Sequence, residues 1–298
     1  MASFPTLRSD SCHTPPAHAK QTRPRSRRRL SLESLESRRL LAVFLVDTFT
    51  DSATGTCGIG GTGNNGCSLR SAIIAANAAP GADTINLPIG THSLSITNFL
   101  SVPDQERGDL NITDDLTISG NTSDPTLTVI NANQIDRVFD VRRPDPFSPS
   151  QGPTLVTAIF AGLTIQGGRV TDALPGGGIS GDNRTDIELR HTIVRNNDVN
   201  DVDKPLNNSG DADGGGIATS GNLLLDNANI SNNNAIGFGG GIAMIDDGTL
   251  SIRDSVIIDN TAGLDGGGIW AGNLANYQIN LFEMVAIDGN QAGPTSRG

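Results

Sequence analysis

The most concentrated set of side chains that could bind a ligand is an acidic segment between residues 198 and 213. Its five aspartates are Asp198, Asp201, Asp203, Asp211 and Asp213. Carboxylate oxygens are preferred ligands of Ca²⁺, so one expectation is a calcium site formed by Asp201, Asp203, Asp211 and Asp213. Their spacing matches neither an EF-hand loop nor a nonapeptide calcium repeat. The alternative is a solvated acidic loop.

Residues suited to catalysis are few. Enzymes that cleave glycosidic bonds use paired carboxylates, and adjacent aspartates occur only as Asp114-Asp115 and Asp246-Asp247. Both pairs adjoin strand-like segments, and we interpret both as turns. We place His191 in a strand column with Asn227 and Asp254, as a surface histidine without an acid–base partner. No catalytic residue and no cofactor apart from calcium is assigned. The sequence favours a protein that is not an enzyme.

A repeated structure must position these side chains. The phrase Gly-Gly-Gly-Ile occurs four times, at Gly176–Ile179, Gly214–Ile217, Gly239–Ile242 and Gly266–Ile269. One apolar column advances in steps of 29, 36, 27 and 30 residues through Ile165, Val194, Ile230, Ile257 and Ile287. A second column runs through Phe160, Leu189, Leu225, Ile252 and Phe282. Self-similarity at this period indicates a solenoid of stacked units.

The units are too short and too rich in Gly and Asn for helix pairs, and their alternation of apolar and polar residues predicts strands. We therefore expect an all-β fold, a right-handed single-stranded parallel β-helix with an N-terminal capping helix. Each coil should hold two or three short strands and lie ~4.8 Å from the next. The longest step contains an insertion, Val199–Asp213, which should be a surface loop.

Stacking places equivalent residues of successive coils above one another. Asparagines recur in one column, at Asn197, Asn233, Asn260 and Asn290. Their amides can hydrogen-bond to the copies above and below. Charges alternate in sign in another column, at Arg190, Asp226, Arg253 and Glu283. Because opposite charges on neighbouring strands attract, we expect a charge ladder on one outer face.

Charge is divided unevenly along the chain. The 298 residues carry a net charge of −11, yet residues 1–42 hold nine basic and three acidic side chains. The acidic remainder argues against nucleic-acid binding. We interpret residues 1–42 as a basic export leader without a fixed structure. The alternative is a disordered tail on a cytosolic protein. The apolar run Leu40–Val46 is too short to span a membrane.

Two N-terminal segments resemble known families. Residues 30–42, LSLESLESRRLLA, are similar to the LEPR-xLL type of leader on bacterial surface proteins, although Ser37 stands where that pattern has Pro. The resemblance implies export. Residues 67–91, from Cys67-Ser68-Leu69-Arg70 through Asp83-Thr84-Ile85 to Gly90-Thr91, resemble the CSLREA-type N-terminal domain. That resemblance implies a cap at residues 43–82 on a right-handed β-helix of secreted or surface proteins, followed by coils at 83–298.

The cap should contain a short helix and a disulfide. Ser68 is suited to the N-cap position, and Leu69, Ala72, Ile73 and Ala76 form an apolar stripe at helical spacing. The family glutamate is Ser71 here, so the usual capping box is absent. Cys57 and Cys67 flank a Gly- and Asn-rich loop and should pair in an oxidising compartment. A metal site is the competing interpretation.

The later repeats are similar to those of polymorphic outer-membrane proteins, which pair a GGA[ILV] phrase with an F..N phrase. The matching segments are Ile230–Asn233 with Gly239–Ile242, and Ile257–Asn260 with Gly266–Ile269. The family alanine is Gly here, and Ile replaces Phe. This resemblance implies a surface passenger used in adhesion. We expect a monomeric bacterial surface protein that acts in adhesion, glycan binding or envelope structure, with glycans or surface proteins as partners. The alternatives are a pectate-lyase-like lyase or hydrolase, and a truncated passenger of a larger surface protein.

Overall fold

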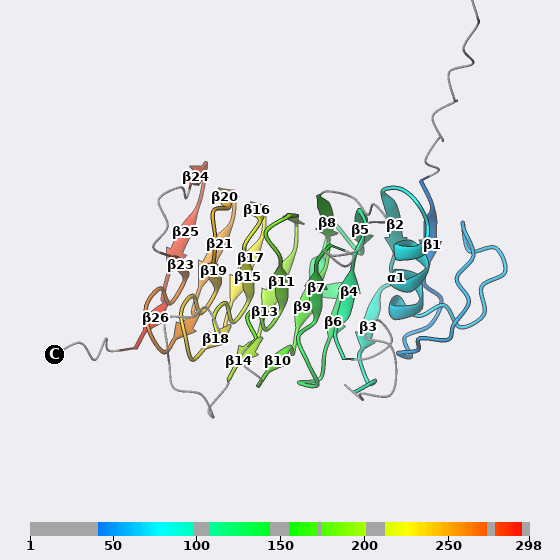
Figure 1. Cartoon of the computed structure of the whole chain (residues 1–298), viewed down its shortest axis with the longest axis horizontal. Coiled ribbons are helices and arrows are strands. Elements are labelled where there is room, and N and C mark those ends of the chain that lie inside the picture. Colours follow the sequence, from blue (N-terminus) through cyan, green and yellow to red (C-terminus); the bar gives the residue numbers. More distant parts are fainter. Residues whose placement is uncertain are drawn as a thin grey trace, which may run out of the picture. The chain divides into compact units, whose positions relative to one another are not determined.

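The computed structural model describes residues 41–97, 108–143, 155–171, 174–200, 212–272 and 278–293. Within these ranges the chain forms four all-parallel sheets, whose strands stack along one axis as the coils of a β-helix (Figure 1). A later coil contributes one strand to each sheet in a fixed order, for example β12 (Thr185–Arg190), β13 (Ile193–Arg195), β14 (Asp198–Val199) and β15 (Ile217–Thr219). The expected parallel β-helix is confirmed. The four coils from β8 (Val156–Ala161) to β23 (Ile269–Ala271) each hold one strand more than expected, because a two-residue strand also pairs in them.

Sheets A and B are the two longest. Sheet A contains eight strands, in the order β1 (Val43–Leu45), β2 (Asp83–Asn86), β5 (Leu116–Ser119), β8 (Val156–Ala161), β12 (Thr185–Arg190), β16 (Asn222–Asp226), β20 (Thr249–Arg253) and β24 (Gln278–Phe282). Sheet B contains seven, in the order β3 (Gly90–Ser93), β6 (Thr128–Asn131), β9 (Thr164–Gln166), β13 (Ile193–Arg195), β17 (Asn229–Ser231), β21 (Val256–Ile258) and β25 (Ala286–Asp288).

Sheets C and D complete the coil. Sheet C contains six strands, in the order β4 (Leu110–Ile112), β7 (Phe139–Val141), β11 (Ile179–Gly181), β15 (Ile217–Thr219), β19 (Ile242–Met244) and β23 (Ile269–Ala271). Sheet D contains the two-residue strands β10 (Arg169–Val170), β14 (Asp198–Val199), β18 (Asn234–Ala235), β22 (Thr261–Ala262) and β26 (Gln291–Ala292). A 3-10 helix, η2, spans Pro125–Leu127.

The core consists of stacked aliphatic columns. The strand register confirms the column Ile165, Val194, Ile230, Ile257 and Ile287. It confirms the second column from Phe160 to Ile252, but places Leu281 rather than Phe282 opposite Ile252. The last coil has one extra residue between its sheet A and sheet B strands, so counting back from Ile287 assigns the wrong residue. The repeat spacing alone did not reveal this insertion.

The corners explain why Gly, Asn and Asp recur. One residue with positive φ follows each sheet A strand in five successive coils, at Gly162, His191, Asn227, Asp254 and Glu283. The prediction that His191, Asn227 and Asp254 form a strand column is therefore wrong, since they occupy left-handed corner positions. Such positions favour Gly, Asn and Asp.

The expected asparagine ladder is present at the next corner. Oδ1 of Asn233 accepts hydrogen bonds from the backbone N and the Nδ2 of Asn197, at 3.1 and 3.0 Å. Nδ2 of Asn233 donates to Oδ1 of Asn260 and to the carbonyl of Val194, both at 3.0 Å. Asn260 repeats this pattern with Asn290. The ladder thus satisfies buried backbone groups between the sheets.

The glycine phrases pack against this ladder. The first glycine of each phrase has a φ of 64–80°, at Gly176, Gly214, Gly239 and Gly266. A Cβ on the third glycine would lie 2.9–3.0 Å from the ladder amide in each coil, at Gly178, Gly216, Gly241 and Gly268. The phrase is therefore needed for one left-handed turn and one close approach.

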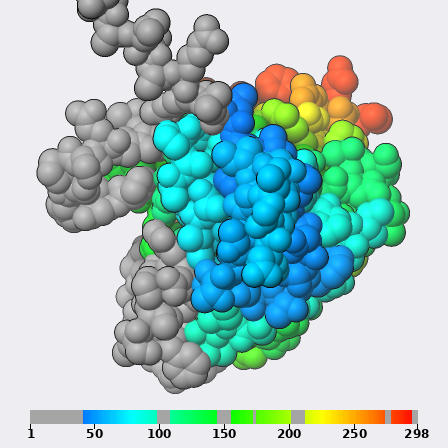
Figure 2. Space-filling view, turned by 90° about the vertical axis from the view of Figure 1, so that its right-hand side faces the viewer, coloured from blue at the N-terminus to red at the C-terminus, as the bar shows by residue number. Residues whose placement is uncertain are grey.

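The N-terminal end of the stack is covered by the cap, which shows in blue in Figure 2. Helix α1 (Leu69–Ala78) contacts β1, β2 and β4. Ser68 is its N-cap, as predicted, and its side chain accepts from the Ser71 backbone N. The predicted apolar stripe is buried, and Cys57 and Cys67 form the expected disulfide. At the opposite end the core columns finish on exposed aliphatic side chains, namely Ile279, Leu281 and Ile287.

Candidate functional site

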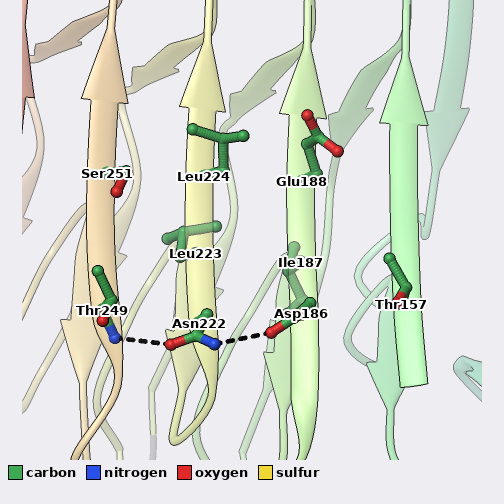
Figure 3. Close-up of a pocket in the computed structure, with 9 residues that line it drawn as sticks. All are labelled: Thr157, Asp186, Ile187, Glu188, Asn222, Leu223, Leu224, Thr249 and Ser251. Carbon is green, nitrogen blue, oxygen red and sulfur yellow. Dashed lines mark hydrogen bonds between the residues drawn. The ribbon is translucent and has the colours of Figure 1, made fainter. Parts of the chain in front are cut away.

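A groove of about 370 Å³ lies on the outer face of sheet A, across β8, β12, β16 and β20 (Figure 3). Because alternate strand residues face opposite sides, the same strands fill the core with one set of side chains and line the groove with the other. The lining residues are Thr157, Asp186, Ile187, Glu188, Asn222, Leu223, Leu224, Thr249 and Ser251. The lining therefore combines polar side chains with the aliphatic side chain of Leu224, whereas the side chains of Ile187 and Leu223 point into the core.

One row of the groove is fixed by hydrogen bonds between strands. Nδ2 of Asn222 donates to Oδ1 of Asp186 at 2.8 Å, and Oδ1 of Asn222 accepts from the backbone N of Thr249 at 2.9 Å (Figure 3). Both the oxygen and the nitrogen of the Asn222 amide thus form hydrogen bonds to neighbouring strands. A ligand would meet the carboxylate of Asp186 and the amide of Asn222 in one defined orientation.

The middle row combines a carboxylate with an apolar surface. Glu188 lies beside Leu224 on the next strand, and Leu224 lies beside Ser251. Arg190 donates from Nε and from an Nη to the two oxygens of Glu188, at 2.8 Å each. The negative charge of Glu188 is therefore offset by a cation at the rim.

The third row contains the predicted charge ladder. The register places Arg190, Asp226 and Arg253 side by side, and Arg253 donates to both oxygens of Asp226, at 3.1 and 2.6 Å. The hydrogen bonds from Arg253 hold the pKa of Asp226 below its ordinary value; burial opposes them less strongly, and the charge of Arg253 adds a smaller lowering effect. Arg190 instead pairs within its own strand with Glu188.

Glu283 does not belong to this ladder. Phe282 occupies the position opposite Arg253, and Glu283 lies at the following corner with a φ of 37°. The extra residue in the last corner displaces it by one position. The ladder therefore comprises one interstrand ion pair, Asp226–Arg253, with Arg190 in register beside it.

Most of the predicted calcium ligands lie outside the described residues. This holds for Asp201, Asp203 and Asp211. Asp213 is buried, and its Oδ1 accepts from the backbone N of Phe238 at 2.7 Å. Within the described ranges, no cluster of three or more His, Cys, Asp or Glu side chains could hold a metal ion. The calcium site stays a prediction.

The remaining acidic pairs and His191 are spread over the coil. Asp114-Asp115 lies in the bend before β5, where Oδ1 of Asp115 accepts from the backbone N of Thr157 at 2.8 Å. Asp246-Asp247 lies in the bend before β20. His191 is exposed at its corner. The groove brings together Asp186 and Glu188 instead, which sequence reasoning missed although their two-residue spacing on a strand was a usable signal.

Sequence reasoning also missed three ionisable residues at the capped end. His92 and Asp83 stand in core columns that are aliphatic elsewhere, opposite Ile130 and Leu116. Burial lowers the pKa of His92 and raises the pKa of Asp83. Nε2 of His92 lies 3.3 Å from the Pro88 carbonyl, and the Asp83 carboxylate accepts from the backbone N of Ala42.

Arg70 is the third. Its side chain is 1% exposed and forms a bidentate ion pair with Asp51, at 2.8 and 3.2 Å. It also donates to the carbonyls of Gly108 and Asp109, at 2.7 and 2.9 Å. Arg70 thus joins the cap helix both to the loop before it and to the first coil.

The fold is a parallel β-helix with a groove of mixed polar and aliphatic lining on one sheet. No family model matches the chain, and no curated protein or solved structure gives a match. In the part of the chain that the structure describes, no helix is both long and apolar enough to cross a membrane.

Proposed function

We propose that this protein is an exported bacterial surface protein that binds glycans through the groove on sheet A. The observation that carries the proposal is the Asp186–Asn222–Thr249 row beside Leu224, within a groove of about 370 Å³. Ligand sites combine a few oriented polar groups with apolar contact surface. Hydroxyl groups of a sugar can exchange hydrogen bonds with the carboxylate and amide, while its C–H face contacts Leu224.

Three sequence features support export. Residues 1–42 are basic and resemble a LEPR-xLL leader, and residues 67–91 resemble the CSLREA-type domain of secreted and surface proteins. The Cys57–Cys67 disulfide is the third, since disulfides persist in oxidising compartments. The similarity of the glycine phrases to polymorphic outer-membrane repeats supports a role in adhesion.

A glycoside hydrolase is the second candidate. Asp186 and Glu188 are two residues apart on one strand, so their backbone positions are separated by about 7 Å. Inverting glycosidases place two carboxyl groups ~6.5–9.5 Å apart. Against this function, both oxygens of Glu188 accept from Arg190. A general base would have to release that guanidinium before it could activate water.

One experiment separates binding from hydrolysis. The purified protein is incubated with immobilised neutral and acidic polysaccharides, and both retained protein and released reducing sugar are measured. We expect retention without product, and weaker retention for Asn222→Ala, which removes both hydrogen bonds of the row. Asn234→Ala, on β18 of sheet D outside the groove lining, is the matched control, because the side chain of Asn234 hydrogen-bonds only to Asp198. Release of sugar that Asp186→Asn abolishes would support the hydrolase. Absence of retention on every polysaccharide would contradict glycan binding.

A further inference from the structure

The charge of the groove restricts its ligand. Among its lining residues, the only ionisable side chains are Asp186 and Glu188. The others supply hydroxyls, one amide and aliphatic groups. Any ligand therefore meets carboxylates, neutral polar groups and the aliphatic side chain of Leu224, while the guanidinium of Arg190 pairs with Glu188 at the rim.

The two carboxylates differ in their partners. Arg190 offsets the charge of Glu188 through two hydrogen bonds. Asp186 accepts from the neutral amide of Asn222 and, among the described residues, forms no ion pair. Asp186 therefore contributes an uncompensated negative charge to the groove.

That charge has opposite effects on two kinds of glycan. A carboxylate accepts strong hydrogen bonds from ligand hydroxyls, because a charged acceptor roughly doubles the strength of a hydrogen bond. The same charge repels carboxylate or sulfate groups on a ligand. The two effects therefore favour uncharged glycans and disfavour glycans that carry carboxylate or sulfate groups.

We propose that the groove selects uncharged glycans, with Asp186 as the hydroxyl acceptor and as the residue that disfavours uronate and sulfated chains. This proposal rests on the proposed function, because it specifies the ligand of the same groove. Asn222 orients Asp186, and Leu224 supplies the apolar contact. Lining hydroxyls on either side, from Thr157 and Ser251, extend the polar contacts across neighbouring strands.

The test compares binding of soluble mannan, β-glucan and polygalacturonate to the wild type, to Asp186→Asn and to Asp259→Asn. Asp259 is an exposed acidic residue at a left-handed corner, where Asn is also favoured, and it lies outside the groove lining. Loss of the Asp186 charge should strengthen polygalacturonate binding about fivefold, from one like-charge pair near 4 Å in water. It should weaken binding of the preferred neutral glycan by about tenfold, the loss of a charge-assisted hydrogen bond.

The outcomes separate this inference from the proposed function. Wild-type preference for a neutral glycan, reduced in Asp186→Asn and kept in Asp259→Asn, supports the inference. Polygalacturonate bound as tightly as the neutral glycans would refute the inference and leave glycan binding standing. Equal changes in both variants would show that only net charge matters, and would overturn the role of Asp186. Failure to bind all three glycans would overturn the proposed function itself.

Discussion

Replacement of Asn233 by alanine should destabilise the β-helix far more than its small size suggests. The side chain is 1% exposed and makes four hydrogen bonds with the coils on either side, to Asn197, Val194 and Asn260. At ~1 kcal/mol for each bond, the loss is about 4 kcal/mol. The N–H of Asn197 and the carbonyl of Val194 would each also lose a partner inside the core, because both residues are buried.

The neighbouring Asn234 provides the matched control. It is half-buried and its side chain makes one hydrogen bond, from Nδ2 to Oδ1 of Asp198 at 2.6 Å. Asn234→Ala should therefore cost about 1 kcal/mol. Guanidinium unfolding, followed by far-UV circular dichroism and by the fluorescence of the single Trp270, measures both variants.

The difference in stability between Asn233→Ala and Asn234→Ala tests whether the asparagine ladder stabilises the stack. A shift of the midpoint at constant m-value reports a change in stability alone. Equal midpoints for Asn233→Ala and Asn234→Ala would refute the reasoning that the ladder stabilises the stack. A changed m-value for Asn233→Ala alone would show that the coils on either side of the ladder unfold separately.

Three further predictions concern ionisable side chains. Arg70→Met should lower the free energy of unfolding by about 3–5 kcal/mol, because it leaves the buried carboxylate of Asp51 without its cation. A loss below about 1 kcal/mol in chemical denaturation would show that the Arg70–Asp51 pair is dispensable for stability. His92 has a lowered pKa in the folded state, so the unfolded chain binds its proton first as the pH falls below about 6.5. Stability should therefore be complete above that pH and decline below it, by at most about 1.4 kcal/mol per pH unit, and His92→Leu should flatten this decline in thermal melts between pH 5 and 7. Asp226→Arg should destabilise more than Asp226→Ala, because it places like charges beside Arg253; equal melting temperatures would contradict the interstrand pair.

The repeat made much of the fold predictable. In a solenoid, equivalent residues of successive coils lie above one another, so the spacing of Ile165, Val194, Ile230 and Ile257 specifies the register directly. The asparagine ladder followed from the same columns. The N-cap Ser68 and the apolar stripe of α1 are signals within a short segment, so the helix could be predicted from them. The disulfide could also be predicted, because only a short loop separates Cys57 from Cys67.

The prediction was wrong where a corner differed by one residue. Glu283 and Phe282 were each assigned to a column by constant spacing, yet the last coil contains an extra corner residue. A one-residue change moves every preceding side chain to the other face of its strand. No pattern within the coil itself indicates which corner absorbs the insertion.

The amino-acid sequence by itself determined the architecture of this protein: the stack of parallel strands, the aliphatic columns and the asparagine ladder. These depend on residues repeated at one period, and each repeat specifies its neighbour. Only the tertiary structure decided the site. The groove combines Asp186, Asn222 and Thr249 from three different coils, and its charge depends on whether Arg190 pairs along its strand or across to the next. Arg190 can pair with Glu188 on its own strand or with Asp226 on the next one. The packing geometry of the side chains, rather than their spacing along the chain, determines which of these ion pairs forms.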